Sequence, residues 1–136
     1  MKLDMNVVRN LLIWLEDNLD LSYTDNVAWF SSLSYKDAAN DLDIAPEIIM
    51  YTSIRLEEAG FIEAVIDGPD GGLSVCEYIT LTYSGHDYLN SIKDNSIWKK
   101  ISSKLGNEVT AATFEVLKNI GQALLEQKLQ SLLLGN

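Results

Sequence analysis

A catalytic site is hard to assemble in this 136-residue chain, which holds one cysteine and one histidine. Nucleophilic catalysis needs a serine or cysteine beside a base that a third group orients. His86 follows helix-initiating sequence, so we interpret it as a structural residue that bonds a nearby backbone or carboxylate group. Cys76 lies in a β-prone run and is expected to pack as an inert thiol. We therefore predict that the protein is not an enzyme and has no catalytic residue.

Ligand sets for metals and cofactors are also missing from the sequence. Zinc sites are built from clusters of Cys and His, and here Cys76 and His86 stand ten residues apart. The glycine-rich run at residues 67–72 lacks the alternating acidic ligands and the terminal Glu of a calcium loop, so we interpret it as a hairpin tip. The sequence holds no phosphate-binding loop and no dinucleotide fingerprint. We expect no metal and no cofactor.

Charge is distributed unevenly along the chain, whose net charge is −10. Residues 1–60 hold 4 basic and 11 acidic side chains, residues 61–90 hold 0 and 5, and residues 91–136 hold 6 and 4. Close approach to a polyphosphate would be repulsive over the first 90 residues. The single cysteine, the absence of an apolar signal core and the absence of an apolar run of about 20 residues favour a cytoplasmic protein without a membrane partner.

Two helices joined by three residues are predicted at residues 35–42 and 46–59. Ser34 suits the cap of the first helix, and Pro46 suits the first position of the second, where its missing N–H costs nothing. Gly60 supplies the left-handed residue that ends the second helix. This spacing is typical of a helix-turn-helix.

A helix at residues 3–19 precedes this pair, and a hairpin follows it. Residues 61–67 and 73–82 are predicted to be antiparallel strands joined by a glycine-rich tip, and Thr82 suits the cap of the next helix. In the loop at residues 21–34, the run at 27–30 is β-prone enough for a short strand. The order predicts an α+β, mainly α, fold: a winged helix-turn-helix with a two-stranded wing.

The chain is expected to divide into a winged-helix core at residues 1–92 and a C-terminal helical extension at 93–136, within one domain. The extension contains predicted helices at residues 97–105 and 110–134. The second carries a broad apolar stripe of Phe114, Leu117, Gly121, Leu124, Leu125, Leu129 and Leu132. Two arrangements stay open: this helix packs on the first helix, or it pairs with a second copy in a homodimer.

The helix at residues 46–59 holds the position of a recognition helix, and its two sides differ. At 100° per residue, the inward stripe is expected to be Ile48, Ile49, Thr52, Leu56 and Ala59. The candidate partner-binding face is Glu47, Met50, Tyr51, Ile54, Glu57 and Glu58, together with Ser53. Major-groove readers place Arg, Lys, Asn or Gln there. An apolar surface rimmed by acid favours a protein partner over nucleic acid, unless other helices cover it.

The only basic cluster of the sequence is Lys93, Lys99, Lys100 and Lys104. A solvated helix face is one interpretation of this cluster. A strip that contacts phosphates without reading sequence is the other.

Several segments of the chain resemble a known family. They are Leu3-Asp-Met, Tyr51, the run from Leu56 to Ile62 (LEEAGFI), Leu81-Thr-Tyr-Ser-Gly-His-Asp-Tyr-Leu89, Ile97-Trp98 and Phe114-Glu-Val-Leu-Lys118. In this order they resemble a family of short bacterial and prophage-borne proteins classed as a domain of unknown function. The resemblance implies a winged-helix-like fold and a frequent phage setting, and it brings no catalytic residues.

From these features we predict a non-enzymatic winged-helix protein of phage or prophage origin that acts as a protein-interaction or regulatory module. The alternative function is a DNA-binding transcriptional regulator that uses the lysine cluster.

Overall fold

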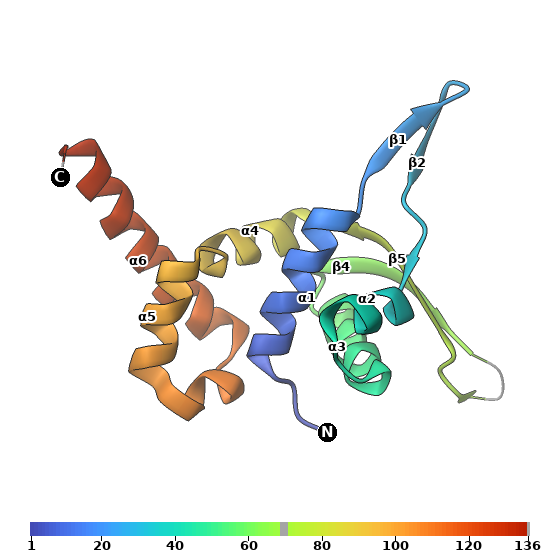
Figure 1. The fold of residues 1–136 in the computed structure, drawn as a ribbon, viewed down its shortest axis with the longest axis horizontal. Helices are drawn as coiled ribbons and strands as arrows, with labels where there is room; N and C mark the ends of the chain where they lie inside the picture. The colour runs from blue at the N-terminus through green and yellow to red at the C-terminus, as the bar shows by residue number, and fades with distance from the viewer. Residues whose placement is uncertain (69–70, 136) are drawn as a thin grey trace.

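Helices make up most of the α+β structure, a computed structural model that describes residues 1–68 and 71–135 (Figure 1). Pro69 and Asp70 of the predicted hairpin tip lie outside the described residues. The elements follow in the order α1 (Met5–Asn18), β1 (Leu21–Thr24), β2 (Val27–Phe30), β3 (Leu33–Ser34), α2 (Tyr35–Leu42), α3 (Pro46–Glu58), β4 (Ile62–Asp67), β5 (Val75–Leu81), α4 (Tyr83–Ile92), α5 (Asn95–Leu105), the 3-10 helix η2 (Gly106–Ala111) and α6 (Phe114–Leu133).

Local sequence sets the ends of the predicted helices. Pro46 occupies the first turn of α3, and Gly60 follows that helix with a φ of 78°, as predicted. At α2, the carboxylate of Asp37 accepts a hydrogen bond of 2.8 Å from the backbone N–H of Ser34. The hydroxyl of Thr82 accepts one of 3.1 Å from the backbone N–H of Gly85, so Thr82 caps α4 as expected.

β3, β5 and β4 form a three-stranded antiparallel sheet in the order β3-β5-β4. β4 and β5 pair from Ile62 opposite Leu81 to Asp67 opposite Val75, with a bulge between Glu63 and Ala64. The two long strands were predicted. β3 was not, because two residues carry too short a pattern to recognise in sequence.

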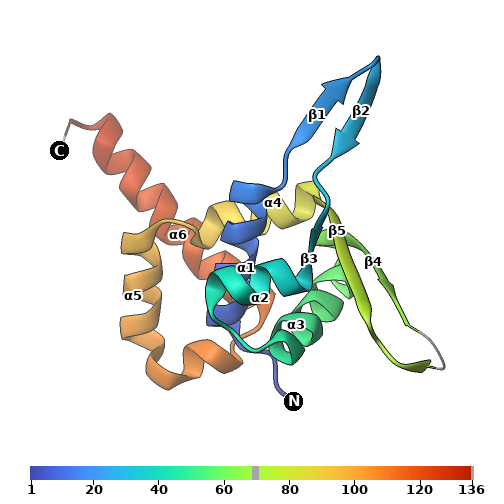
Figure 2. The same cartoon turned by 45° about the vertical axis from the view of Figure 1, so that its right-hand side comes forward.

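A separate hairpin of β1 and β2 projects from the body of the molecule (Figures 1 and 2). The predicted strand at residues 27–30 is confirmed as β2, whereas its partner Leu21–Thr24 had been interpreted as loop. The two strands are joined by Asp25 and Asn26, which have φ angles of 50° and 62°. Positive φ at both central residues is what a tight two-residue hairpin turn requires.

α1 runs through the centre of the molecule and supplies the middle of the core. Val8, Leu11, Leu12 and Leu15 are completely buried. The helix contacts α2, α3, α4, β5 and η2, so one buried stripe unites elements from both halves of the chain.

Arg9 joins α1 to the end of α4 from inside the structure. Its guanidinium donates hydrogen bonds to the carbonyl oxygens of Ile92 (3.0 Å) and Lys93 (2.7 Å) and to Oδ1 of Asn95 (2.9 Å). It also lies over the ring of Trp98, 5.3 Å from the centroid. A cation at the carbonyl end of a helix satisfies acceptors that have no partner within the helix. Arg9 therefore fixes the junction between residues 1–92 and 93–136.

α6 packs mainly on α4 and α5 rather than on the first helix, which was one of the two expected arrangements. The other, pairing with a second copy, stays a prediction. Gly121 allows the close approach, because a Cβ there would lie 2.0 Å from the carbonyl oxygen of Ser91. The predicted helix start at residue 110 is wrong: residues 106–111 form η2, and Thr113 caps α6.

The predicted apolar stripe of α6 is buried only over its first half. Leu117 and Gly121 are buried, and Phe114, Leu124 and Leu125 are partly buried. Leu129 and Leu132 are exposed, because the helix extends beyond α4 and α5 (Figure 1).

Candidate partner-binding face

One side of α3 presents apolar side chains between carboxylates. Tyr51 and Ile54 are half-buried, while Glu47, Glu57 and Glu58 are exposed. Glu47, Tyr51, Ile54 and Glu58 follow one another at helical spacing, so they form a single stripe. The structure thus brings together four of the six residues predicted for this face, while Glu57 is exposed to one side of the stripe.

Met50, the sixth, was placed wrongly, because its side chain is only 8% exposed and belongs to the core. Ser53 is also buried: its hydroxyl lies 2.6 Å from the Tyr78 hydroxyl on β5. Ile48 and Ala59 were expected to face inward, but both are exposed. The buried arc of α3 is rotated toward Met50 and Ser53 because α1, α2 and β4 all pack on the helix. Ile49, Thr52 and Leu56 are buried as predicted.

A groove of about 420 Å³ lies beside this face. It is lined by Met1, Tyr35, Pro46, Glu47, Met50, Tyr51, Ile54 and Leu73. Leu73 comes from the approach to β5, so the groove joins α3 to the β4–β5 hairpin. Sequence reasoning missed Met1, Tyr35 and Leu73, since helical periodicity gives no information on what a neighbouring element places beside the helix.

Arg55 of α3 is the only basic residue between Lys36 and Lys93. Its guanidinium lies 3.0 Å from the Glu58 carboxylate and 5.2 Å from the centroid of the Tyr51 ring. The β4–β5 hairpin adds the exposed carboxylates of Glu63, Asp67 and Glu77. A phosphate backbone placed across α3 and the hairpin would therefore meet mainly negative charge.

The four lysines of the predicted phosphate strip do not act on this face. Lys93 follows the end of α4 and pairs with Glu16 of α1. Lys99, Lys100 and Lys104 are exposed on α5. α1 separates α5 from α3 in both views (Figures 1 and 2). Any nucleic acid bound by these lysines would lie away from α2 and α3.

The single cysteine is buried, and the single histidine lies beside a carboxylate. Burial raises the pKa of the Cys76 thiol to about 11, so the thiol stays protonated at neutral pH. Nδ1 of His86 lies 3.5 Å from the Glu16 carboxylate, which also binds Lys93. This contact agrees with the carboxylate partner expected for His86. Across the described ranges, no group of three or more His, Cys, Asp or Glu side chains could hold a metal ion.

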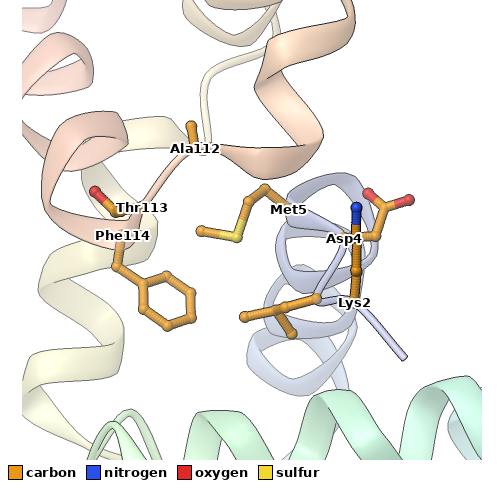
Figure 3. A pocket seen from close by; sticks show the side chains of 7 residues that line it. Lys2, Asp4, Met5, Ala112, Thr113 and Phe114 are labelled. Atoms are coloured by element: carbon orange, nitrogen blue, oxygen red, sulfur yellow. The ribbon is translucent and has the colours of Figure 1, made fainter.

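A second cavity, of about 780 Å³, lies between the N-terminal segment and the start of α6 (Figure 3). It is lined by Lys2, Leu3, Asp4, Met5, Ala112, Thr113 and Phe114. Met5 and Phe114 point toward its centre, and Phe114 makes edge contacts with Phe61 and Tyr88. Lys2 and Asp4 are the ionisable side chains among these lining residues. The cavity was not predicted, because its two walls lie over 100 residues apart in the sequence.

No helix in residues 1–68 or 71–135 has the length and apolar character needed to cross a membrane.

Comparison with known proteins gives relatives but no described function. The chain is 22% identical over 132 residues to an uncharacterised protein of Haemophilus influenzae, covering 95% of this chain and 99% of that protein. No solved structure matches the chain significantly. A family model described as "Hypothetical protein (DUF2513)" matches residues 2–111. The chain belongs to this DUF2513 family.

Proposed function

We propose that the protein is a non-enzymatic winged-helix protein that binds another protein through α3 and the β4–β5 hairpin. In this proposal residues 1–92 are the winged-helix core, α2 and α3 are the helix-turn-helix, and β4 and β5 are the wing. Support comes from the order α1, β3, α2, α3, β4, β5, with β3 paired to β5 in the same sheet. The β1–β2 hairpin is then an insertion between the first helix and the first strand.

The main support for a protein-binding function is the chemistry of the α3 face. Tyr51 and Ile54 border an apolar groove, and the carboxylates of Glu47 and Glu58 stand at the two ends of their stripe. Aromatic and aliphatic side chains in a groove are typical anchors for a protein partner. The surrounding acid repels nucleic acid and selects a partner surface that carries Lys or Arg.

Affinity capture from the cells in which the protein naturally occurs tests this proposal. The three baits are the wild type, Tyr51→Ala and Tyr83→Ala. We expect the wild type to retain a protein partner and Tyr51→Ala to lose it, because removing a central anchor costs about 2 kcal/mol or roughly thirtyfold in affinity. Tyr83→Ala is the matched control, since Tyr83 is 86% exposed on α4, outside the face. Equal capture by all three forms, or no captured protein together with tight binding of duplex DNA, would contradict the proposal.

The alternative is a DNA-binding transcriptional regulator, favoured by the exposed lysines of α5. It predicts DNA affinity that falls with salt and weakens when Lys99 and Lys100 become Ala. Affinity for a duplex that is unchanged in the double variant would reject this version.

A phage or prophage origin and a cytoplasmic location complete the proposal. The first rests on the family resemblance and is tested by whether phage genes flank the gene in bacterial genomes. The second is tested by fractionating cells that produce the protein at its natural level.

A further inference from the structure

β4 forms one edge of the three-stranded sheet, and its outer side is open. In the order β3-β5-β4, only β5 is hydrogen-bonded to it. In the described part of the chain, no backbone hydrogen bond outside this ladder reaches residues 62–66. The main contacts of β4 are with β5 and α3, and Figure 2 shows no element beyond its outer side. Alternate N–H and C=O groups of β4 are therefore free to pair with an added strand.

The strand lacks most of the features that stop an exposed edge from pairing. Natural edges are protected by short length, proline, lysine or a bulge. β4 runs for six residues, Ile62–Asp67, without proline or lysine. The bulge between Glu63 and Ala64 places its extra residue, Ile79, on β5, so β4 itself stays regular. The edge is thus long enough for a peptide to add to it as a further strand.

The side chains of β4 determine which strand would fit beside it. Glu63, Val65 and Asp67 are exposed on one face, whereas Ala64 and Ile66 on the other face are partly buried against the core. An added strand places its own side chains next to these. Opposite charge favours Lys or Arg beside the two carboxylates, and the partly buried face favours apolar residues. The complement of this edge is therefore two basic residues that flank three β-prone residues.

The strands of this chain do not supply that complement. Antiparallel pairing of two β4 strands about Val65 would set Glu63 of each copy against Asp67 of the other. Parallel pairing in register would set each acid against itself, and like charges directly opposite are destabilising. None of the strands β1 to β5 contains a Lys or Arg. A strand with complementary charge must therefore come from another protein.

We propose that β4 binds, by strand addition, an extended segment of another protein in which two Lys or Arg residues flank three β-prone residues. Backbone hydrogen bonds along β4 supply the affinity, and Glu63 and Asp67 select the basic residues. This inference rests on the proposed function and deepens it, because it specifies how the partner of the α3 face engages the β4–β5 hairpin.

A titration of the ¹⁵N-labelled full-length chain with the capped peptide SKVTVKS, followed by NMR, tests the inference. We expect saturable shifts of the β4 backbone amides with a Kd between about 0.1 and 1 mM. The double variant Glu63→Lys, Asp67→Lys should bind this peptide at least about tenfold more weakly and should bind the peptide SEVTVES instead. Glu126→Lys makes the same kind of charge change at an exposed position of α6 and should leave the affinity unchanged.

N-methylated peptides test whether the backbone of the probe pairs with β4. One version is methylated at its two valines and the other at its two lysines, whose N–H groups point to opposite sides of an extended strand. One version should lose binding and the other should retain it, because only one side of an added strand faces β4. No saturable shift, shifts away from β4, the same result with both methylated peptides, or unchanged binding by the double variant would each overturn the inference.

The Tyr51→Ala variant separates this inference from the proposed function. It should bind the peptide as the wild type does, because Tyr51 lies on α3 and not at the sheet edge. If capture of the partner depends on Tyr51 and the peptide does not bind β4, only the strand-addition inference fails. If the peptide binds β4 and capture does not depend on Tyr51, only the proposed role of the α3 face fails.

Discussion

Arg9→Met is the substitution that most directly tests how the two halves of the chain are held together. Methionine keeps an unbranched apolar stem of similar reach, so the change removes mainly the guanidinium. It eliminates the three hydrogen bonds to Ile92, Lys93 and Asn95 and the contact with the Trp98 ring. The carbonyl oxygen of Ile92 is then left buried without this donor.

The expected magnitude follows from these contacts. A hydrogen bond with a charged group contributes about 1.5–3 kcal/mol, so three bonds set an upper limit several kcal/mol high. Burial lowers the pKa of Arg9, which shows that the charge is partly desolvated, and removing it recovers some of that cost. We therefore expect the free energy of unfolding to fall by about 2–4 kcal/mol, a large part of the 5–15 kcal/mol typical of a domain.

Urea unfolding followed by circular dichroism and tryptophan fluorescence measures this change. Arg55→Met is the control, because Arg55 makes an exposed ion pair with Glu58 and its loss should cost under about 1 kcal/mol. If Arg9→Met cost under 1 kcal/mol, or no more than the control, Arg9 would not be the link between the halves.

Three further predictions concern stability and reactivity. Gly121→Ala should lower the free energy of unfolding by about 1–3 kcal/mol, because the new Cβ would lie 2.0 Å from the Ser91 carbonyl oxygen. The control Gln122→Ala, at an exposed position, should have little effect in the same urea assay. The Cys76 thiol, whose pKa burial raises to about 11, should react with a thiol reagent at pH 8 only after unfolding, and rapid labelling of the native protein would contradict this. Asp94 accepts bonds from Lys128, Ser96 and Ile97, which lower its pKa, so its stabilising effect should be present above its ordinary pKa of 3.8 and fade as the pH falls below it. Asp94→Ala should therefore lower the free energy of unfolding by about 1 kcal/mol at pH 7, and Asp94→Asn should lower it less, because Asn also caps helices. A difference in stability between Asp94→Ala and the wild type that is as large at pH 2 as at pH 7 would show that the charge of Asp94 does not stabilise the fold.

Local chemistry made most helix ends and the main hairpin predictable from sequence. Pro46, Gly60 and Thr82 act through their own backbone or through a residue three positions away, so their roles are legible without any tertiary information. Periodicity likewise identified Ile49, Thr52 and Leu56 as core positions.

The features that could not be predicted from sequence depend on contacts between segments that are distant in the chain. Met50 and Ser53 are buried because α1, α2 and β4 pack around α3, and a single helix pattern does not reveal its neighbours. Lys93 belongs to the lysine cluster in sequence but pairs with Glu16, 77 residues away. β1 was missed because apolar residues normally mark buried strands, and here the hairpin exposes them to solvent.

The measurement that bears most directly on the central claim is the identity of what crosslinks to the α3 face in cells. A photo-crosslinking phenylalanine analogue replaces Tyr51 in one form and Tyr83 in a control form, and each adduct is identified by mass spectrometry. We predict a protein adduct at position 51 that is absent at position 83. A nucleic-acid adduct at position 51, or the same adducts at both positions, would contradict it.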